Sequence, residues 1–531
     1  MKTRIISGQE AREKLLTGVN VMADAVASTL GPRGQNVAIE KVTPKGDTWD
    51  RRVVHDGVTV ARSIQLVDGA ENMGAQLLLQ ASQKQVDVVG DGTTVVMILA
   101  QAIINECFKL VATGINPMSL RKGLEDGVKL LTQELESMAT PINGLKDLKY
   151  IATISAEDEE LGEMVAKTLN KIGKDGVITV EESKSADTLV DYQEGMQLDR
   201  GIVNPYFVTN AERMEAISEN TYLLITDKAV TSFFDIQNFL TEFVKTSKNL
   251  VIISPEIGGD ALPLLIRNKL EGHISVLCIQ APGFGEDQKN ILQDIAILTG
   301  GKFISAEAGY KFQDLTVDDL GFAEYVTANK DETIIVGGRG KKEDIQNRIT
   351  SIQSTLEAED SDYDKERLRA RLGKLTNGVA VIRVGGRTEV EMRERRERVL
   401  DSVAATRAAM EKGIVSGGET VYLHVRKMLT EEGREVSLTD SILYRSLAKP
   451  FKKLISNADL DEVEIALKLD KKGKNWGADV TDGQVKDMIK AGIVDPVLVS
   501  INALHNAVSV AIQIVTTNNI IVPILEEKRG E

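Results

Sequence analysis

The sequence predicts a multidomain protein of the mixed α and α/β class, and three observations support that prediction. Long stretches near both ends carry apolar residues at helical spacing. The middle of the chain alternates short β-branched runs with helical stretches. The length of 531 residues allows about three or four domains. Because the two helical ends resemble each other in character, one domain built from both termini, with an α/β unit inserted, accounts for the pattern.

The amino-terminal third is predicted to be mainly helical. Residues 9–30 show helical spacing and end at the breaker sequence "LGPRGQ". The runs "VAIEKV" and "RRVVHDGVTVARSIQL" predict a strand, a turn and a second strand or helix start. Residues 93–113 and 115–139 then predict two long helices, the second broken by Pro141.

The middle third changes to a mixed pattern between about residues 194 and 379. Predicted strands are "DGVITVEES", which precedes it, and then "YLLITD", "NLVIISPE", "ISVLCIQ" and "GKFISAE". Gly195 and Gly378 bracket this unit, and each is an ordinary turn glycine taken singly, whereas the pair would also serve as hinges. A charged amphipathic helix over residues 388–412 follows, then further helices and a last strand in "NNIIVPILEE".

Composition argues against several functional classes. The net charge of −15 and the pI near 5.1 oppose binding to nucleic acid, which requires a basic surface. Cys107 and Cys278 are the only cysteines, so no disulfide framework is indicated. We see no signal or transit sequence and no apolar run as long as a membrane span, which predicts a cytoplasmic protein without a membrane partner.

Common nucleotide and metal motifs are missing from the sequence. The glycine-rich stretch "VGGRGKKED" at residues 336–344 lacks the Gly-Lys-Ser/Thr ending of a P-loop and reads as a surface turn. No HExxH or paired CxxC occurs, and the four histidines are scattered. A zinc site is therefore not expected.

The stretch "VVGDGTTVVMILAQAII", residues 88–104, allows two interpretations. Asp91 lies between two glycines, and Thr93 and Thr94 precede a long apolar run. The first interpretation is a helix cap, which is the commoner use of such residues. The second is a cradle in which free N–H groups and the helix dipole face a phosphate, with Asp91 holding the accompanying cation. The pattern alone leaves both open.

Other acidic residues each have an ordinary structural explanation. Asp56 precedes Gly57 in what reads as a hairpin turn. Asp401 lies in the charged helix, three residues after Arg398, and could be a solvated acid. Asp495 precedes a proline-started helix and could be its cap. Spacing cannot connect acids that lie hundreds of residues apart.

An apolar stripe occurs in "FFDIQNFLTEFV", residues 233–244. Phe233, Ile236, Leu240, Phe243 and Val244 share one helical face, a pattern more often found in a core than in a binding site. Phe234 and Phe239 lie off that face, so apolar surface is expected to remain exposed.

Taken together, many segments resemble the GroEL-type, or group I, chaperonin family. The matching segments are "GVNVMADAVASTLGPRGQNV", "ENMGAQLL", "GDGTTVVMILAQAII", "GINPMSLRKG", "GKDGVITVEES", "EGMQLDRG", "APGFGE", "LQDIAILTGG", "TEVEMRERRERV" and "ATRAAMEKGIVSGG". They run from about residue 6 to about residue 517 in the family's order.

The resemblance implies three domains and a ring. An equatorial domain would comprise residues 1–136 and 412–531, an intermediate domain residues 137–193 and 380–411, and an apical domain residues 194–379. Subunits of the family form seven-membered rings, usually two back to back, giving a 14-mer. A GroES-type co-chaperonin is the expected partner, together with non-native polypeptides.

The resemblance also implies an ATPase site. Asp91 would bind Mg²⁺ and Asp401 would orient the attacking water, with help from Asp56. The residues implied to bind ATP are Thr29, Leu30, Gly31, Pro32, Asp91, Gly92, Thr93, Thr94, Val95, Gly418, Asp479, Val480 and Asp495. Thr29, His55 and Thr94 would bind K⁺.

For client polypeptides, the resemblance implies contacts by Tyr206, Phe207, Leu240, Leu262 and Ile266. Departures from the family pattern are Gln237 and Arg267 at usually apolar positions, a longer segment at residues 42–52, Glu419 in place of a glycine, and a tail without Gly-Met repeats. An ATP-driven folding chamber is the leading hypothesis. The alternatives are a holdase or scaffold ring that no longer cycles and a small-molecule ATP-dependent enzyme.

Overall fold

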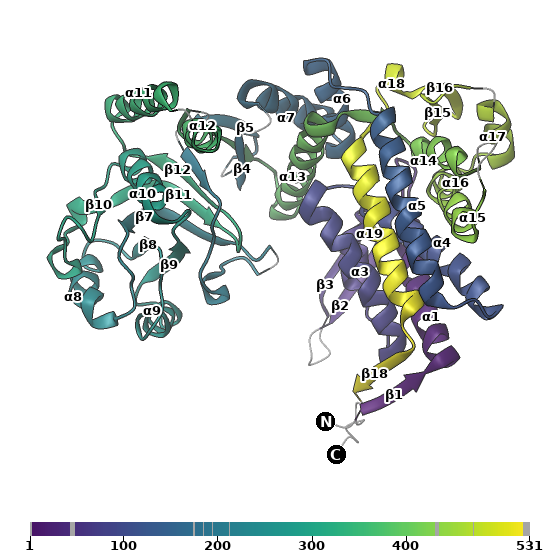
Figure 1. Cartoon of the computed structure of the whole chain (residues 1–531), viewed down its shortest axis with the longest axis horizontal. Helices are drawn as coiled ribbons and strands as arrows, with labels where there is room; N and C mark the ends of the chain where they lie inside the picture. Colours follow the sequence, from purple (N-terminus) through teal and green to yellow (C-terminus); the bar gives the residue numbers. More distant parts are fainter. Residues whose placement is uncertain are drawn as a thin grey trace. The chain divides into compact units, whose positions relative to one another are not determined.

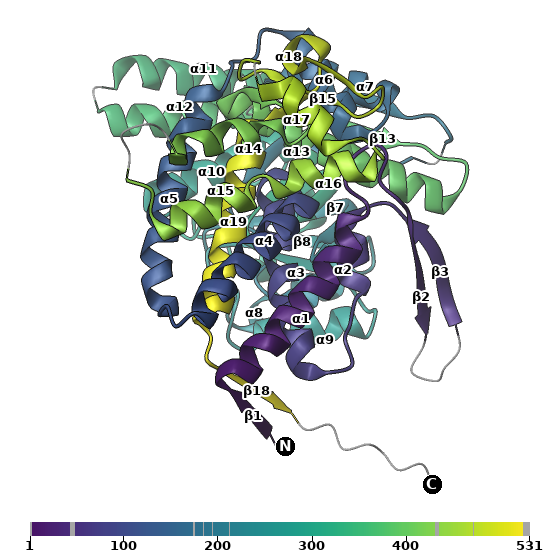
Figure 2. The same cartoon turned by 90° about the vertical axis from the view of Figure 1, so that its right-hand side faces the viewer.

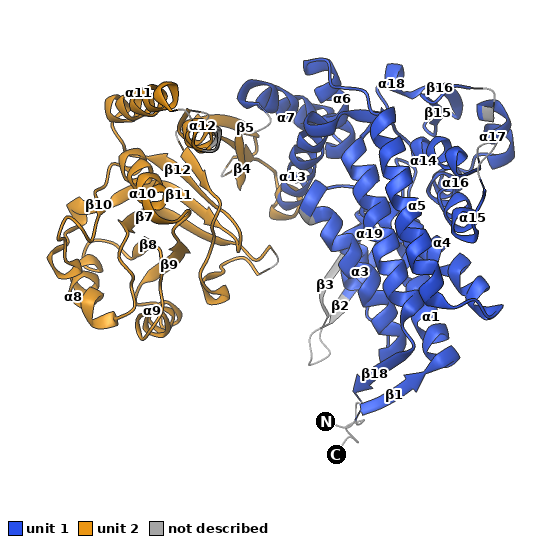
Figure 3. Cartoon of the chain, viewed as in Figure 1, with its two compact units in different colours: residues 1–174, 393–531 blue, residues 175–392 orange. Residues whose placement is uncertain are grey.

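The computed structural model describes residues 3–42, 48–173, 176–183, 185–193, 195–211, 213–359, 361–376, 378–430, 435–470 and 472–523. The chain divides into two compact units, Met1–Lys174 with Arg393–Glu531, and Asp175–Met392 (Figure 3). The first unit is thus built from both ends of the chain with the second inserted, and the predicted fold class is confirmed. The predicted hairpin tip at 43–47 and the tail from residue 524 lie outside the described residues.

Long helices form the centre of the first unit (Figures 1 and 2). They are α1 (Gly8–Ala27), α3 (Gly69–Val89), α4 (Thr93–Ala112), α5 (Pro117–Met138) and α19 (Val497–Thr516). Their apolar faces meet in one large core, in which Leu15, Met97 and Leu504 are fully buried. Burial of that apolar surface is the main stabilising contribution here.

Two of these helices correct an expectation drawn from the sequence. Thr93–Ala112 and Val497–Thr516 are long and apolar enough to cross a membrane, so apolar runs of that length do occur. About half to two thirds of each apolar window is buried inside the protein, 56% for the first and 67% for the second. Their apolar character is explained by their place at the centre of a helical core.

Shorter elements complete the first unit. Its other helices are α2 (Gly57–Ser63), α6 (Leu145–Ala156), α7 (Glu159–Ile172), α14 (Thr420–Val425), α15 (Leu438–Ser446), α16 (Lys449–Asn457), α17 (Glu462–Asp470) and α18 (Met488–Ala491). Its strands form pairs: β1 (Thr3–Ser7) with β18 (Asn519–Pro523), β2 (Val37–Val42) with β3 (Thr48–Val54), β14 (Ile414–Ser416) with β17 (Val494–Pro496), and β15 (Trp476–Asp479) with β16 (Gln484–Asp487). The β1–β18 pair joins the two ends of the chain, with Ile6 opposite Ile520.

The second unit is built on a mixed sheet. Its strands are ordered β6 (Gly195–Leu198), β12 (Thr333–Gly338), β11 (Gly321–Ala328), β7 (Ala216–Thr226), β8 (Asn249–Ser254) and β9 (Ser275–Gln280), and β10 (Phe303–Ile304) pairs with β7. The strands β7, β8 and β9 are parallel, and their central residues are almost all buried, as expected when helices cover both faces. A separate small sheet contains β4 (Val177–Glu182), β13 (Val379–Val384) and β5 (Leu189–Gln193).

The remaining helices are α8 (Phe233–Phe243), α9 (Ala261–Leu270), α10 (Gly285–Thr299), α11 (Lys342–Ala358), α12 (Asp362–Thr376) and α13 (Glu389–Lys412), the last continuing into the first unit. The two contact-defined units divide the predicted intermediate domain between them, because residues up to 174 and from 393 belong to the first. The three-domain boundaries stay a prediction. Of the two predicted hinge glycines, Gly378 has a left-handed backbone, with φ of 60°.

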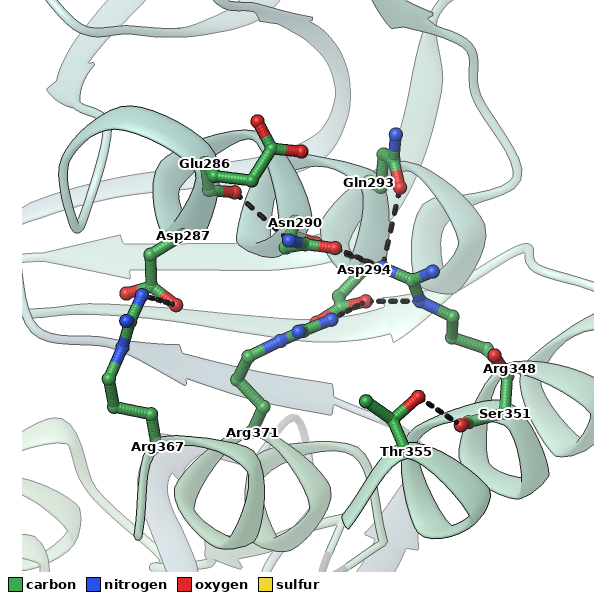
Figure 4. Close-up of polar contacts among 10 residues, drawn as sticks. All are labelled: Glu286, Asp287, Asn290, Gln293, Asp294, Arg348, Ser351, Thr355, Arg367 and Arg371. Carbon is green, nitrogen blue, oxygen red and sulfur yellow. Dashed lines mark hydrogen bonds and ion pairs between the residues drawn. The ribbon is translucent and has the colours of Figure 1, made fainter. Parts of the chain in front are cut away.

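A buried ionic cluster fastens α11 and α12 to α10 (Figure 4). The Asp294 carboxylate, 2% exposed, accepts a hydrogen bond of 2.6 Å from Arg348 Nε and bonds of 2.9 and 3.1 Å from Nε and Nη2 of Arg371. A second pair, Arg367 with Asp287, spans 2.8 Å nearer the surface. The two partly buried guanidinium groups of the inner cluster share this one carboxylate, and Arg348 Nη2 also bonds Asn290 and Gln293. Removing Asp294 would leave both cations without their shared counter-ion.

We therefore expect Asp294→Ala to destabilise the second unit by about 3 kcal/mol or more, since breaking a buried ion pair leaves uncompensated charge. Amide hydrogen exchange across α11 and α12 in the full-length protein would measure the loss. Asp287→Ala, about two turns earlier on the same face of α10 and more exposed, should cost under about 1 kcal/mol. Equal effects of the two substitutions would contradict the special role of Asp294.

Candidate functional site

The first turn of α4 has no side-chain cap. It lies in the stretch for which the sequence allowed either a helix cap or a phosphate cradle. The N-cap residue is Gly92, in the left-handed region with φ of 81°, and it has no side chain to bond the free N–H groups of the turn. Asp91 Oδ1 instead accepts a hydrogen bond of 2.5 Å from the Gly92 N–H, immediately beside it. Asp91 is therefore not the N-cap of α4, and this helix end can receive an anion.

Helix α2 brings a second helix start to the same place. Asp56 is its N-cap and accepts hydrogen bonds from Val58 N at 3.2 Å and Thr59 N at 2.7 Å. The hairpin turn predicted from the Asp-Gly pair was therefore wrong, because these residues begin a helix. Gly57 packs so closely that a methyl group there would lie 2.3 Å from Thr94 Oγ1 and 3.5 Å from Thr29 Oγ1. The absence of a side chain at Gly57 lets these three segments converge.

The loop after α1 is fixed from the other half of the chain. Gly31 has φ of 81°, and a methyl group there would lie 2.1 Å from Leu454 Cδ1 on α16. The Asn457 amide donates to the carbonyls of Ala27 and Leu30 at 3.0 Å each, and to that of Ser28 at 3.4 Å. The predicted nucleotide loop Thr29–Pro32 is thus held by α16, which lies more than 400 residues away in sequence.

The pairing of β14 with β17 positions the next predicted residues. Asp495 lies opposite Val415, and the Gly417 N–H bonds the Ile493 carbonyl at 3.0 Å. Gly418 has a left-handed backbone. A methyl group added to it would lie 3.6 Å from the Ala478 carbonyl oxygen. This contact places the strand β15 next to the glycine loop.

Asp479 and Val480, at the end of β15, are less available than predicted. The Asp479 carboxylate is engaged with Lys486 Nζ at 2.8 Å and with Thr481. Burial opposes ionisation of Asp479, but these hydrogen bonds hold its pKa below the usual value. Val480 is 5% exposed in a small core with Leu454. Only the main chain of Val480 could face a ligand.

Asp401 reaches the site through α13. A methyl group at Gly90 would lie 2.4 Å from Ala404 Cβ and 3.5 Å from the Asp401 carbonyl oxygen. Val89, Ala408 and Val499 pack together in the same region. The turn of α13 that carries Asp401 therefore lies directly against the residue before Asp91, so the Asp401 main chain comes close to the Asp91 loop.

Three carboxyl groups give the site its electrostatic character. Burial raises the pKa of Asp91, and the charges of Glu157 and Asp56 raise it further, while the Gly92 N–H acts in the opposite direction. Burial and Asp91 raise the pKa of Asp495 to about 7. Burial, Asp495 and Asp91 raise the pKa of Glu419 well above its usual value. A cation at this position would relieve the repulsion among the three groups.

The donor set fits Mg²⁺ bound together with phosphates. Among the described residues no group of three or more His, Cys, Asp or Glu side chains could hold a metal ion by itself. Mg²⁺ commonly binds through one or two carboxylates plus substrate phosphates, as Asp91 beside an open helix start would allow. For K⁺, the hydroxyl groups of Thr29 and Thr94 are brought together at Gly57. The resemblance assigns His55 a role through its backbone oxygen, so the contact of its ring with Asn36 Oδ1 at 3.2 Å does not test that prediction.

The predicted client-binding residues of the second unit differ in exposure. Tyr206 is 65% exposed, and Leu262 and Ile266 are half-buried. Phe207 is fully buried and Leu240 is 7% exposed, because both pack in the core under the sheet. In this conformation these two side chains do not present apolar surface to a client, which corrects the prediction for them.

Another residue of α8 supplies exposed apolar surface. Phe234 is 74% exposed, as its place off the helical stripe indicated. The same prediction was wrong for Phe239, which is 3% exposed and packs in the core.

Gly57, Gln85 and Asn457 were not among the predicted site residues. Gln85 could have been found from the sequence, because it is a polar residue on the buried stripe of α3 with Leu78, Ser82 and Val89. No sequence pattern marks Asn457.

The fold and the site define a class of protein in which a helical unit from both chain ends carries an anion site and an inserted α/β unit carries exposed apolar surface. The chain belongs to the TCP-1/cpn60 chaperonin family, whose model matches residues 22–524. The assignment to group I within that family stays a prediction.

Solved structures share the fold. The chaperonin gp146 from bacteriophage EL (Pseudomonas aeruginosa), crystallised in the presence of ATP-BeFx, matches with a TM-score of 0.68 in crystal form II. That match covers 98% of this chain and 99% of the other, at 22% sequence identity. Crystal form I of the same protein gives a TM-score of 0.63 at the same identity and coverage.

The pKa of Asp495 predicts a pH-dependent cost in stability. In the folded protein the carboxyl holds its proton up to about pH 7, whereas the ordinary pKa of an aspartate is 3.8, so the free energy of unfolding falls as pH rises between these values. Asp495→Asn cannot ionise and avoids this loss. We expect its gain in Tm over the wild type, without nucleotide, to increase by roughly 1–3 °C between pH 5 and pH 8.

Asp479→Asn is the matched control for this measurement. Its carboxyl has a pKa below the usual value, so it is ionised across the whole range and the change in Tm should stay constant from pH 5 to pH 8. A gain for Asp495→Asn that does not depend on pH would contradict the assignment.

Proposed function

We propose that this chaperonin is an ATPase that uses Mg-ATP binding and hydrolysis to drive the folding of non-native polypeptides. The observation that carries the proposal is the meeting of Asp91, the open start of α4 and the Asp401 turn of α13. Membership of the chaperonin family supports it, and so does the crystallisation of gp146 in the presence of ATP-BeFx.

The residues of the site divide the work of phosphoryl transfer. Asp91 would hold Mg²⁺, which neutralises charge on the phosphates. The N–H groups at the start of α4, with Thr93 and Thr94, would bind the phosphate oxygens. Asp401 would orient the attacking water and Asp56 would assist it. Thr29–Pro32 would cover the phosphates, while Gly418 and Asp495 would face the adenosine.

The wider assembly is proposed from the resemblance to group I chaperonins. The proposal includes seven-membered rings, usually two back to back in that group, a GroES-type co-chaperonin, K⁺ and a cytoplasmic location. Tyr206 and Phe234 offer apolar surface of the kind that binds unfolded chains without sequence specificity.

A holdase that binds clients without cycling is the main alternative. It would need neither a phosphate site nor an acid placed against it. The presence of Asp56 near Asp91, and of the Asp401 turn of α13 against Gly90, favours hydrolysis over this alternative. A small-molecule kinase would require a polar acceptor pocket beside the nucleotide. We do not propose this function.

Hydrolysis can be tested with Asp401→Ala in the full-length protein. We expect the ATPase kcat to fall by about 100-fold or more, since loss of a residue that positions or activates water typically costs that much. The Kd for ATP should change by less than about threefold, because the phosphate-binding groups remain. Glu397→Ala, one turn earlier on α13 and exposed, is the control and should retain activity.

Two results would contradict the proposal. A wild-type protein that binds no ATP in the presence of Mg²⁺ would exclude the site. A wild type that binds ATP but does not hydrolyse it faster than Asp401→Ala would support the holdase.

Client binding can be tested by removing exposed aromatic surface. Tyr206→Ser combined with Phe234→Ser should weaken capture of a fluorescently labelled, chemically unfolded polypeptide by about 30-fold or more, since each change removes more than 1 kcal/mol of apolar contact. Leu189→Ser on β5, a residue 56% exposed, should leave capture unchanged. Equal loss in both variants would indicate general adhesion rather than a binding face.

A further inference from the structure

Two buried amide side chains form a relay behind the Asp91 loop. Gln85 on α3 is fully buried, and Asn506 on α19 is 8% exposed. Gln85 Nε2 donates to the Asp91 carbonyl at 3.0 Å and to the Val499 carbonyl at 3.1 Å. Asn506 Nδ2 donates to Gln85 Oε1 at 2.9 Å. Both N–H groups and the oxygen of the Gln85 amide are therefore used.

The orientation of the relay follows from its partners. The atoms facing one end of Gln85 are two main-chain carbonyl oxygens, which can only accept hydrogen bonds. The NH₂ group must therefore point toward them, and the Gln85 oxygen must face Asn506. A glutamate in this position would direct a carboxylate at two carbonyl oxygens and lose both bonds.

The relay connects the two sides of the candidate site. Asp91 carries the carboxylate proposed to hold Mg²⁺, and Val499 lies in the first turn of α19, four residues after Asp495. Gly92 packs directly on the relay, since a methyl group there would lie 3.1 Å from Gln85 Nε2 and 2.8 Å from Val499 Cγ1. Ser82 adds a longer bond of 3.4 Å to the Thr93 carbonyl.

We propose that Gln85, oriented by Asn506, is a positioning residue that fixes the Asp91 main chain against α19 and so sets where the Asp91 carboxylate meets the Mg²⁺ of a bound nucleotide. This inference rests on the proposed function. Filling the space with apolar side chains would stabilise the core without the cost of burying two amides. The relay gives what apolar packing does not, a directional restraint on one peptide group.

A matched control for this inference exists in the same helical core. Asn105, on α4, donates to Asn20 Oδ1 at 2.9 Å and to the Gln101 carbonyl at 2.8 Å. Its replacement by leucine removes a part-buried amide without touching the 91–93 loop. The variants to compare in the full-length protein are Gln85→Leu, Gln85→Glu, Asn506→Leu and Asn105→Leu.

The first readout needs no nucleotide. Amide hydrogen exchange over residues 91–95 should become about tenfold faster in both Gln85 variants, because the restraint on the loop is lost. Asn506→Leu keeps the two bonds from Gln85 and frees only its outer end, so about threefold is expected. Asn105→Leu should leave this segment unchanged.

The second readout is the Mg²⁺ concentration that gives half-maximal ATPase activity. We expect it to rise about tenfold in the Gln85 variants, the usual effect of removing a group that orients a metal ligand. The affinity for ADP in EDTA should change by less than about threefold, since it does not require Asp91 to hold a cation.

The outcomes separate the two proposals. If the wild type neither binds nor hydrolyses ATP, the proposed function is overturned and this inference with it. If the wild type is active but the Gln85 variants match Asn105→Leu in both exchange and Mg²⁺ dependence, the positioning role alone is overturned. Asn506→Leu preserves the test should Gln85→Leu fail to fold.

Discussion

The packing of α19 against α3 and α4 is the constraint on which the helical unit and its candidate site both depend. Helices α4 and α19 are apolar over most of their length, and α3 contributes one apolar face. The three helices bury one another's apolar faces, so none has a stable place without the others. Their contact also fixes the position of Gly92 against Val499. The same packing that forms the core therefore defines the mouth of the site.

Glycines at that mouth allow the segments that form the site to approach one another closely. At Gly57, Gly90 and Gly92 an added methyl group would meet Thr94, Ala404 and Val499, respectively, at less than 3 Å. Side chains there would separate the segments that supply hydroxyl, carboxylate and N–H groups. The acidic groups assembled in this way repel one another, which favours a ligand that carries a divalent cation.

Local patterns predicted the features that depend on nearby residues. Helical spacing placed α4 and α19, and the motif GDGTT allowed an open helix start as one of two interpretations, because glycine and threonine act on their own backbone. The burial of Phe207 and Leu240 could not be predicted from local patterns. Which face of α8 is covered depends on the sheet beneath it, and that sheet is formed by strands distant in sequence. The bonds made by Asn457 likewise span more than 400 residues and leave no local pattern.

The pairing of β1 with β18 has a consequence for the order of folding during synthesis. Asp175–Met392 is continuous, so it can complete its core as soon as it leaves the ribosome. The first 174 residues emerge earlier but must wait for α19 and β18, near the end of the chain. Until then the apolar faces of α1, α3 and α4 lack their partner. A protein of the chaperonin family thus passes through a state in which its own nascent chain exposes a large apolar surface.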